Sequence, residues 1–169
     1  MRIIGIDPAL AITGYGIIDC CKNRVSLLKA GAVITRYRQR LPERLNIIYE
    51  KILALLSEYK PDVLVLEKVY VHCHHQTTAF LLGQARGIIC LACAKGNIPL
   101  KEYAATQIKK AIVGKGQASK EQVQQMVLRT LKLKSIPRYH DVTDALALAL
   151  AYSYFEKADS LIKQGSQKA

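Results

Sequence analysis

The sequence predicts an α/β domain built on a five-stranded mixed sheet flanked by helices, and three observations support this class. The first fifth of the chain contains strand-like segments joined by short turns, which is typical of an antiparallel meander. The remainder alternates helical and strand-like patterns, which is typical of parallel strands joined by helices. With 169 residues, half of them hydrophobic, the chain is long enough for one domain with a sizeable core.

Consecutive strands are predicted in the first 34 residues. Arg2–Ile6 is short, apolar and rich in isoleucine, as expected for a strand that is buried on both faces. Asp7 and Pro8 end this strand, because proline has no backbone N–H to continue the ladder. A second apolar run, Tyr15–Ile18, is expected to form a hairpin with the first, and Arg24–Ile34 completes the meander.

The rest of the chain is expected to build the parallel half of the sheet. Leu41–Tyr59 has apolar residues at helical spacing, and Pro61 follows its end. The next apolar run, Asp62–Leu66, is a buried strand that a right-handed crossover would place beside the first strand. The remaining predicted elements are a helix over Ala79–Lys95, a strand over Pro99–Tyr103, and helices over Ala104–Ile112, Lys120–Leu131 and Asp141–Phe155.

The sequence also predicts where the folded domain ends. Residues 1–157 are expected to form the domain, since the last apolar helical pattern ends just before this point. Residues 158–169 are polar and basic without an apolar period, so we expect a disordered tail.

The charge of the chain indicates a polyanionic partner. Lys and Arg total 25 against 13 Asp and Glu, which gives a net charge of +12. Nucleic acid is favoured over a membrane, because the longest purely apolar runs are far shorter than the ~20 residues that a membrane span requires. The five cysteines are odd in number and lie in apolar settings, which is unlike a secreted disulfide framework. We therefore expect a cytoplasmic protein with reduced thiols.

A basic segment follows the meander. It carries four arginines, at positions 36, 38, 40 and 44, around Tyr37. Two interpretations stay open at this point: a solvated connection, or an edge that contacts phosphates.

Four carboxylates are predicted to meet at one place. Asp7 and Glu67 follow buried strands whose carboxyl ends lie at the same edge of the sheet. Asp141 and Asp144, three residues apart, share one face of the first turn of a helix that must pack on the sheet. Each acid alone is explained by a turn or a helix cap, but four clustered anions require neutralising cations. Oxygen ligands favour Mg²⁺ or Mn²⁺, and two such ions suit phosphodiester hydrolysis.

These motifs resemble the RuvC family of Holliday-junction resolvases, and the order of elements resembles the RNase H-like fold. The segments that carry the resemblance are IIGIDPALAITGYGII, VLVLEKVYV, LLGQARG, EYAATQIKKAIVGKGQASKEQVQQMV and DVTDALALALA. The resemblance implies a homodimeric, Mg²⁺-dependent endodeoxyribonuclease that resolves four-way DNA junctions by paired symmetric nicks, in homologous recombination and DNA repair. It also implies partners of the RuvA and RuvB branch-migration type.

The resemblance assigns roles to individual residues. Asp7, Glu67, Asp141 and Asp144 match the catalytic, metal-binding acids of the family, with two Mg²⁺ per site and Mn²⁺ as a substitute. Tyr70 matches an aromatic residue that stacks on unpaired bases at the junction, and Lys109 and Lys120 match basic residues beside the cleaved strand.

Two positions depart from the family pattern. Ala9 stands where the family generally has glycine, which matters only if that turn requires a positive φ. Lys68 stands where glutamine is usual, so an extra cation lies beside the site. The four histidines, His72, His74, His75 and His140, are expected to be surface or loop residues, although any of them could assist proton transfer.

Three alternatives remain from the sequence. A related RNase H-like nuclease acting on RNA or on unbranched duplex has the same charge and the same acids. A non-catalytic junction-binding protein would be indicated by a missing acid, and none is missing. A sugar-kinase-like or actin-like ATPase is disfavoured, because the chain is too short for two such domains and has no phosphate-binding loop of the G-x-x-x-x-G-K-[ST] kind.

Overall fold

The structure is a computed structural model that describes residues 1–21, 24–69 and 76–166. Within that part the strands are β1 (Arg2–Asp7), β2 (Ile12–Cys21), β3 (Arg24–Ile34), β4 (Val63–Glu67) and β5 (Leu100–Tyr103). The helices are α1 (Leu41–Tyr59), α2 (Gln76–Lys95), α3 (Ala105–Val113), α4 (Lys120–Leu131) and α5 (His140–Ser166).

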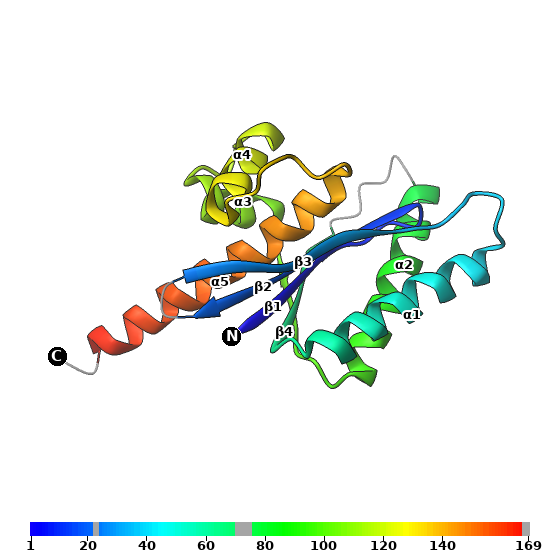
Figure 1. Ribbon diagram of the computed structural model, residues 1–169, viewed down its shortest axis with the longest axis horizontal. Helices are drawn as coiled ribbons and strands as arrows, with labels where there is room; N and C mark the ends of the chain where they lie inside the picture. The colour runs from blue at the N-terminus through cyan, green and yellow to red at the C-terminus, as the bar shows by residue number, and fades with distance from the viewer. Residues whose placement is uncertain (22–23, 70–75, 167–169) are drawn as a thin grey trace.

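The strands form one sheet in the order β3-β2-β1-β4-β5 (Figure 1). The first three strands pair antiparallel as a meander. β4 pairs parallel to β1, and β5 pairs parallel to β4. This topology confirms the predicted mixed sheet and the crossover through α1. The largest difference in a strand boundary is at β2, which begins and ends three residues beyond the predicted Tyr15–Ile18.

Helices cover both faces of the sheet, α1 and α2 on one and α3, α4 and α5 on the other (Figure 1). The alternation of side chains along β1 explains the two cores. Ile4 and Ile6 belong to the core under α1 and α2, whereas Ile3 belongs to the core under the other three helices. All three are fully buried, as expected for a central strand between two helical layers.

Helix α5 lies unusually close to the sheet because glycines line its path. A Cβ atom at Gly5 would lie 2.0 Å from the carbonyl oxygen of Ala145, and one at Gly14 would lie 2.0 Å from that of Asp141. At Gly16 a Cβ would meet the Leu146 side chain at 2.4 Å. Only residues without a side chain allow this approach, so the glycines of β1 and β2 set the position of α5.

The prediction of a disordered tail is wrong for residues 158–166, because α5 continues to Ser166 and projects beyond the sheet (Figure 1). Helix nucleation is unfavourable, but the buried first half of α5 is already helical. Each further residue therefore extends the helix by one backbone hydrogen bond at a small cost in conformational entropy. Leu161 in this segment is 60% exposed. The segment does not pack on the core, so its sequence needs no apolar residues at helical spacing. The predicted boundary at residue 157 therefore falls inside a helix.

Helix α2 has one buried and one exposed face. Ala85, Ile89, Ala92 and Cys93 are buried against the sheet and α1. Phe80 and Leu91 are exposed on the outer side. Among the described residues, Thr77–Lys95 is the one helix that is long and apolar enough, by length and composition, to cross a membrane, and 22% of its most apolar window is buried.

Candidate active site

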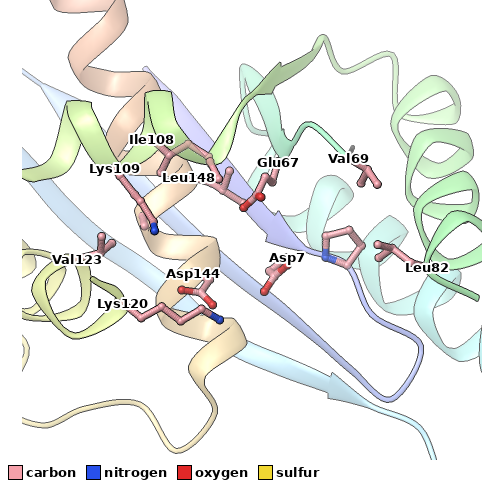
Figure 2. A pocket seen from close by; sticks show the side chains of 13 residues that line it. Asp7, Glu67, Val69, Leu82, Ile108, Lys109, Lys120, Val123, Asp144 and Leu148 are labelled. Atoms are coloured by element: carbon pink, nitrogen blue, oxygen red, sulfur yellow. The ribbon is translucent and has the colours of Figure 1, made fainter. Parts of the chain in front are cut away.

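A cavity of about 360 Å³ opens where β1 and β4 end, between the sheet and helices α3, α4 and α5. Its charged lining residues are Asp7, Glu67, Lys109, Lys120 and Asp144. Figure 2 shows the three carboxylates facing a common space, with the amino groups of both lysines pointing toward it. The structure thus brings together five of the seven residues that the sequence assigned to the site.

Asp7 and Glu67 occupy the edge of the sheet that the sequence predicted. β1 and β4 run parallel, and their last paired residues are Ile6 and Leu66. The next residue on each strand is an acid, so the two side chains leave neighbouring strands, about 5 Å apart, at the same end. Asp7 is half-buried, whereas Glu67 lies at the more exposed mouth of the cavity.

The two acids of α5 have different positions. Asp144 lines the cavity beside Asp7. Asp141 is not among the lining residues, although its backbone lies against Gly14, which pairs with Asp7 across the hairpin. The negative charge of Asp141 nevertheless acts on both Asp7 and Asp144. Asp141 therefore belongs to the charge cluster at the rim rather than to the cavity wall.

Burial and mutual repulsion both disfavour the charged forms of the acids in this cavity. Burial raises the pKa of Asp7 from 3.8 to about 7, and the carboxylates of Asp144, Asp141 and Glu67 add to the rise. Burial also raises the pKa of Glu67 and of Asp144, with a further contribution from a neighbouring acid in each case. A cation placed among these groups would restore their ordinary acidity.

The two predicted lysines reach the site from different helices. Lys109 lies on α3, and Lys120 is the first residue of α4. Ser119 caps α4, since its hydroxyl oxygen accepts a hydrogen bond from the backbone N–H of Gln122 at 3.3 Å. The charge of Lys120 lowers the pKa of Asp7, Glu67 and Asp144, whereas that of Lys109 acts on Glu67. Lys120 is thus the more central cation.

Tyr70, His72, His74 and His75 lie outside the described residues. His140 is the first residue of α5, where it is exposed, and its charge lowers the pKa of Asp144.

Arg86 on α2 was not singled out from the sequence. Its guanidinium donates a hydrogen bond to the backbone carbonyl of Glu67 at 2.8 Å and pairs with the Glu102 carboxylate on β5. Arg86 thereby holds the carboxyl end of β4, and its charge lowers the pKa of Glu67. A lone arginine in the middle of an otherwise apolar helix is the signal that could have identified it, because such a charge needs a partner.

The turn after Asp7 tolerates the departure at position 9. Ala9 is not among the described residues with positive φ, so no glycine is required there. Its carbonyl accepts a hydrogen bond from the buried Thr13 hydroxyl at 2.6 Å. The alanine is therefore neutral for the backbone. Lys68 follows Glu67 as an exposed residue.

The donor set suits a hard divalent cation. Within the described part of the chain, no three His, Cys, Asp or Glu side chains lie close enough together to hold a metal ion by themselves. Mg²⁺ is ordinarily bound through one or two carboxylates, with waters and substrate phosphates completing the shell. The all-oxygen acids of this cavity and their raised pKa values fit that mode of binding.

Comparisons with known proteins give a family match over most of the chain. The family model described as "Crossover junction endodeoxyribonuclease RuvC" matches residues 3–152. A curated relative of that name from Syntrophomonas wolfei is 38% identical over 169 residues, which cover 100% of this chain and 98% of the relative. Another, from Burkholderia thailandensis, is 43% identical over 154 residues, which cover 91% of this chain and 84% of the relative.

Solved structures show the same architecture. The RuvC of T. thermophilus in complex with Holliday junction substrate superposes with a TM-score of 0.88 at 29% identity, covering 94% of this chain and 96% of that one. The yeast mitochondrial Holliday junction resolvase Ydc2 shares the fold, with a TM-score of 0.66 at 10% identity over 96% of this chain and 83% of that one.

Proposed function

Because the chain belongs to the RuvC family of crossover junction endodeoxyribonucleases, we propose that it cuts four-way DNA junctions by hydrolysing phosphodiester bonds. The observation that carries the proposal is the cavity at the ends of β1 and β4, where Asp7, Glu67 and Asp144 meet two lysines. A net charge of +12 attracts the DNA backbone, while the acids need cations at the cutting site itself. The activity belongs to homologous recombination and DNA repair.

The nuclease depends on a divalent metal, and we propose Mg²⁺, two ions per site, with Mn²⁺ as a substitute. Asp7, Glu67 and Asp144 would hold the ions from the cavity wall, and Asp141 would contribute from the rim. When bound, the ions supply an activated water and stabilise the leaving oxygen. The raised pKa values support this assignment, because burial and mutual repulsion disfavour the charged acids even with Lys120 beside them, and a bound cation would stabilise their charged forms.

The protein's own cations would orient the DNA. An ammonium at Lys120 or Lys109 can hold the scissile phosphate and stabilise charge that develops on it. For Tyr70 we propose stacking on an unpaired base at the junction, which is supported by the family pattern alone.

Paired cuts require two active sites, and we propose that the protein acts as a homodimer through α2. Phe80, Gly83, Gly87 and Leu91 recur at helical spacing on its outer side. A Cβ atom at either glycine would meet nothing within 4 Å, so another helix could approach closely there. A two-fold axis across this stripe would pair identical apolar surfaces, as closed symmetric dimers do.

We propose the cytoplasm as the site of action and a branch-migration motor of the RuvA and RuvB type as a partner. The latter is supported only by family membership.

Cleavage of a synthetic four-way junction with Mg²⁺ tests the proposal, with linear duplex and an RNA–DNA hybrid as matched substrates. We expect symmetric nicks in the junction only, and an Asp7→Asn variant that binds the junction without cutting it. Cleavage of the hybrid instead would overturn the substrate while keeping the metal site. Tight binding without nicks in the unmodified protein would indicate a junction-binding protein.

A further inference from the structure

The connection between β3 and α1 forms an exposed arginine loop, residues 36–40. Arg36, Arg38 and Arg40 are all exposed, and Tyr37 is 80% exposed at the tip. In Figure 1 this connection projects beyond the end of the sheet at which β1 terminates, which is the end that carries the carboxylates. The loop therefore lies at the same end of the sheet as the cavity.

The arginine loop is fastened to the turn that follows the first catalytic acid. The backbone N–H of Thr35 donates to the carbonyl of Ala11 at 3.0 Å, and its hydroxyl donates to the carbonyl of Leu10. Arg44, in the first turns of α1, donates from Nε to the same hydroxyl at 2.8 Å. These contacts tie the base of the loop to the β1–β2 turn.

The backbone of the loop is ordered by its own hydrogen bonds. The N–H of Gln39 donates to the Arg36 carbonyl at 3.0 Å, and the Gln39 side-chain oxygen accepts from the Arg36 N–H at 2.6 Å. The Glu43 carboxylate accepts from the N–H of Arg40 at 3.3 Å. The arginine side chains are not needed for any of these bonds, so they remain available to a ligand.

The guanidinium groups of the loop form no ion pair with the part of the chain that the structure describes. The Arg38 guanidinium lies over the Tyr37 ring at 5.7 Å from its centroid, and its Nε donates to the tyrosine hydroxyl at 3.1 Å. The exposed Tyr37 ring thus packs against the Arg38 guanidinium instead of joining the core. A connection that was only solvated would not need this contact.

The register of the strands gives the approximate distance from Asp7 to the base of the loop. Asp7 pairs with Gly14, which pairs with Ala32, three residues before Thr35. Strand spacing and rise per residue then place the base of the loop on the order of 15 Å from Asp7. At 3.4 Å per base pair this corresponds to about four base pairs.

We propose that the arginine loop binds the phosphate backbone of a duplex arm, at least about four base pairs from the cleaved phosphate. This inference rests on the proposed function and adds a second contact that sets the direction of the arm relative to the cavity. Planar guanidinium groups on an ordered turn suit phosphate oxygens better than mobile lysines do.

The test compares two triple variants of equal charge in an Asp7→Asn background, so that the DNA stays intact. One carries Arg36→Gln, Arg38→Gln and Arg40→Gln. The control replaces Arg24, Lys60 and Lys95 with glutamine, three exposed cations at the opposite end of the sheet. Binding to a synthetic four-way junction is measured by fluorescence anisotropy between 50 and 200 mM NaCl, with the melting temperature as a check on folding.

We expect the loop variant to bind the junction at least tenfold more weakly and to lower the salt slope by about 2 to 3, since each lost phosphate contact removes about 0.9. The control variant should change affinity less than threefold. Equal losses in the two variants, or no loss in the loop variant, would overturn the inference while leaving the function intact. A failure of the Asp7→Asn parent to bind the junction would overturn the proposed function itself.

Discussion

At the scale of single residues, Asp7 bears the largest cost of assembling the site. Its folded-state pKa is about 7 against an ordinary value of 3.8. Between these two pH values the folded protein keeps a proton on Asp7 that the unfolded chain releases, so the stability of the metal-free protein falls as pH rises through this window. The penalty is complete above pH 7 and amounts to at most about 4 kcal/mol.

Asp7→Asn should therefore stabilise the metal-free protein at pH 8 by several degrees and have little effect at pH 4. Thermal melting in the presence of a chelator measures both values. Asp159→Asn, at an exposed position on α5, serves as the control and should change neither. A shift of the same size at both pH values would contradict the raised pKa.

Added Mg²⁺ should reduce or reverse the stability advantage that Asp7→Asn has over the wild type in the absence of metal. Millimolar Mg²⁺ is expected to raise the melting temperature of the wild-type protein, because a ligand that binds only the folded state stabilises it by mass action. The Asp7→Asn protein should gain less, since it lacks a charged ligand for the ion. An equal gain in the two proteins would place the metal elsewhere.

The two lysines of the cavity should differ in their effects on pH dependence. Lys120 lowers the pKa of three acids, whereas Lys109 acts on Glu67 among these acids. Lys120→Gln should therefore move the acid limb of the pH–rate profile to higher pH, and Lys109→Gln should move it less. We expect a rate loss on the order of 10²-fold for Lys120→Gln if its ammonium holds the reacting phosphate. Identical pH–rate profiles in the two variants would show that Lys120 has no special effect on the acids of the cavity.

At the scale of secondary-structure elements, the contact between α5 and the β1–β2 hairpin sets the position of the α5 acids relative to Asp7. Gly14→Ala would place a Cβ atom 2.0 Å from the carbonyl oxygen of Asp141. We expect destabilisation by about 1–3 kcal/mol and slower cleavage, because the first turn of α5 must move away from Asp7. Urea unfolding and a cleavage assay measure the two effects.

Gly116→Ala is the matched control for this change. Its Cβ would meet the nearest atom at 3.4 Å, an ordinary contact, so stability and rate should stay close to those of the wild type. A Gly14→Ala protein as active as this control would show that the acids do not depend on the close approach of α5.

At the scale of the whole molecule, the exposed face of α2 is the surface proposed for dimerisation. Leu91→Lys places a charge on that face and should shift the protein to a monomer in sedimentation experiments. Paired nicks in the junction should then become single nicks, because each site acts alone. Leu161→Lys, on the projecting part of α5, is the control and should leave the dimer intact. An unchanged dimer in Leu91→Lys would move the interface elsewhere.

The sequence by itself determined the sheet, the order of its elements and the edge at which the acids gather. These depend on local patterns: isoleucine-rich runs in β1 and β4, helical spacing in α1, and the crossover rule that makes β1 and β4 neighbours. The ends of elements were less well determined, because the extent of β2 depends on its pairing with β3 and that of α5 on propagation from its packed half.

Only the tertiary structure decided which groups make the cavity. Asp144 lines it whereas Asp141 does not, a difference that depends on how α5 packs against β1 and β2. Arg86 reaches the carbonyl of Glu67 from a helix whose sequence shows no link to β4. The sequence leaves open whether the arginine loop is a solvated connection, whereas the hydrogen bonds of Thr35 place the base of the loop beside the turn that follows Asp7. The physical reason is the same in each case: local sequence sets which segments form, whereas contacts between distant segments set where each side chain lies.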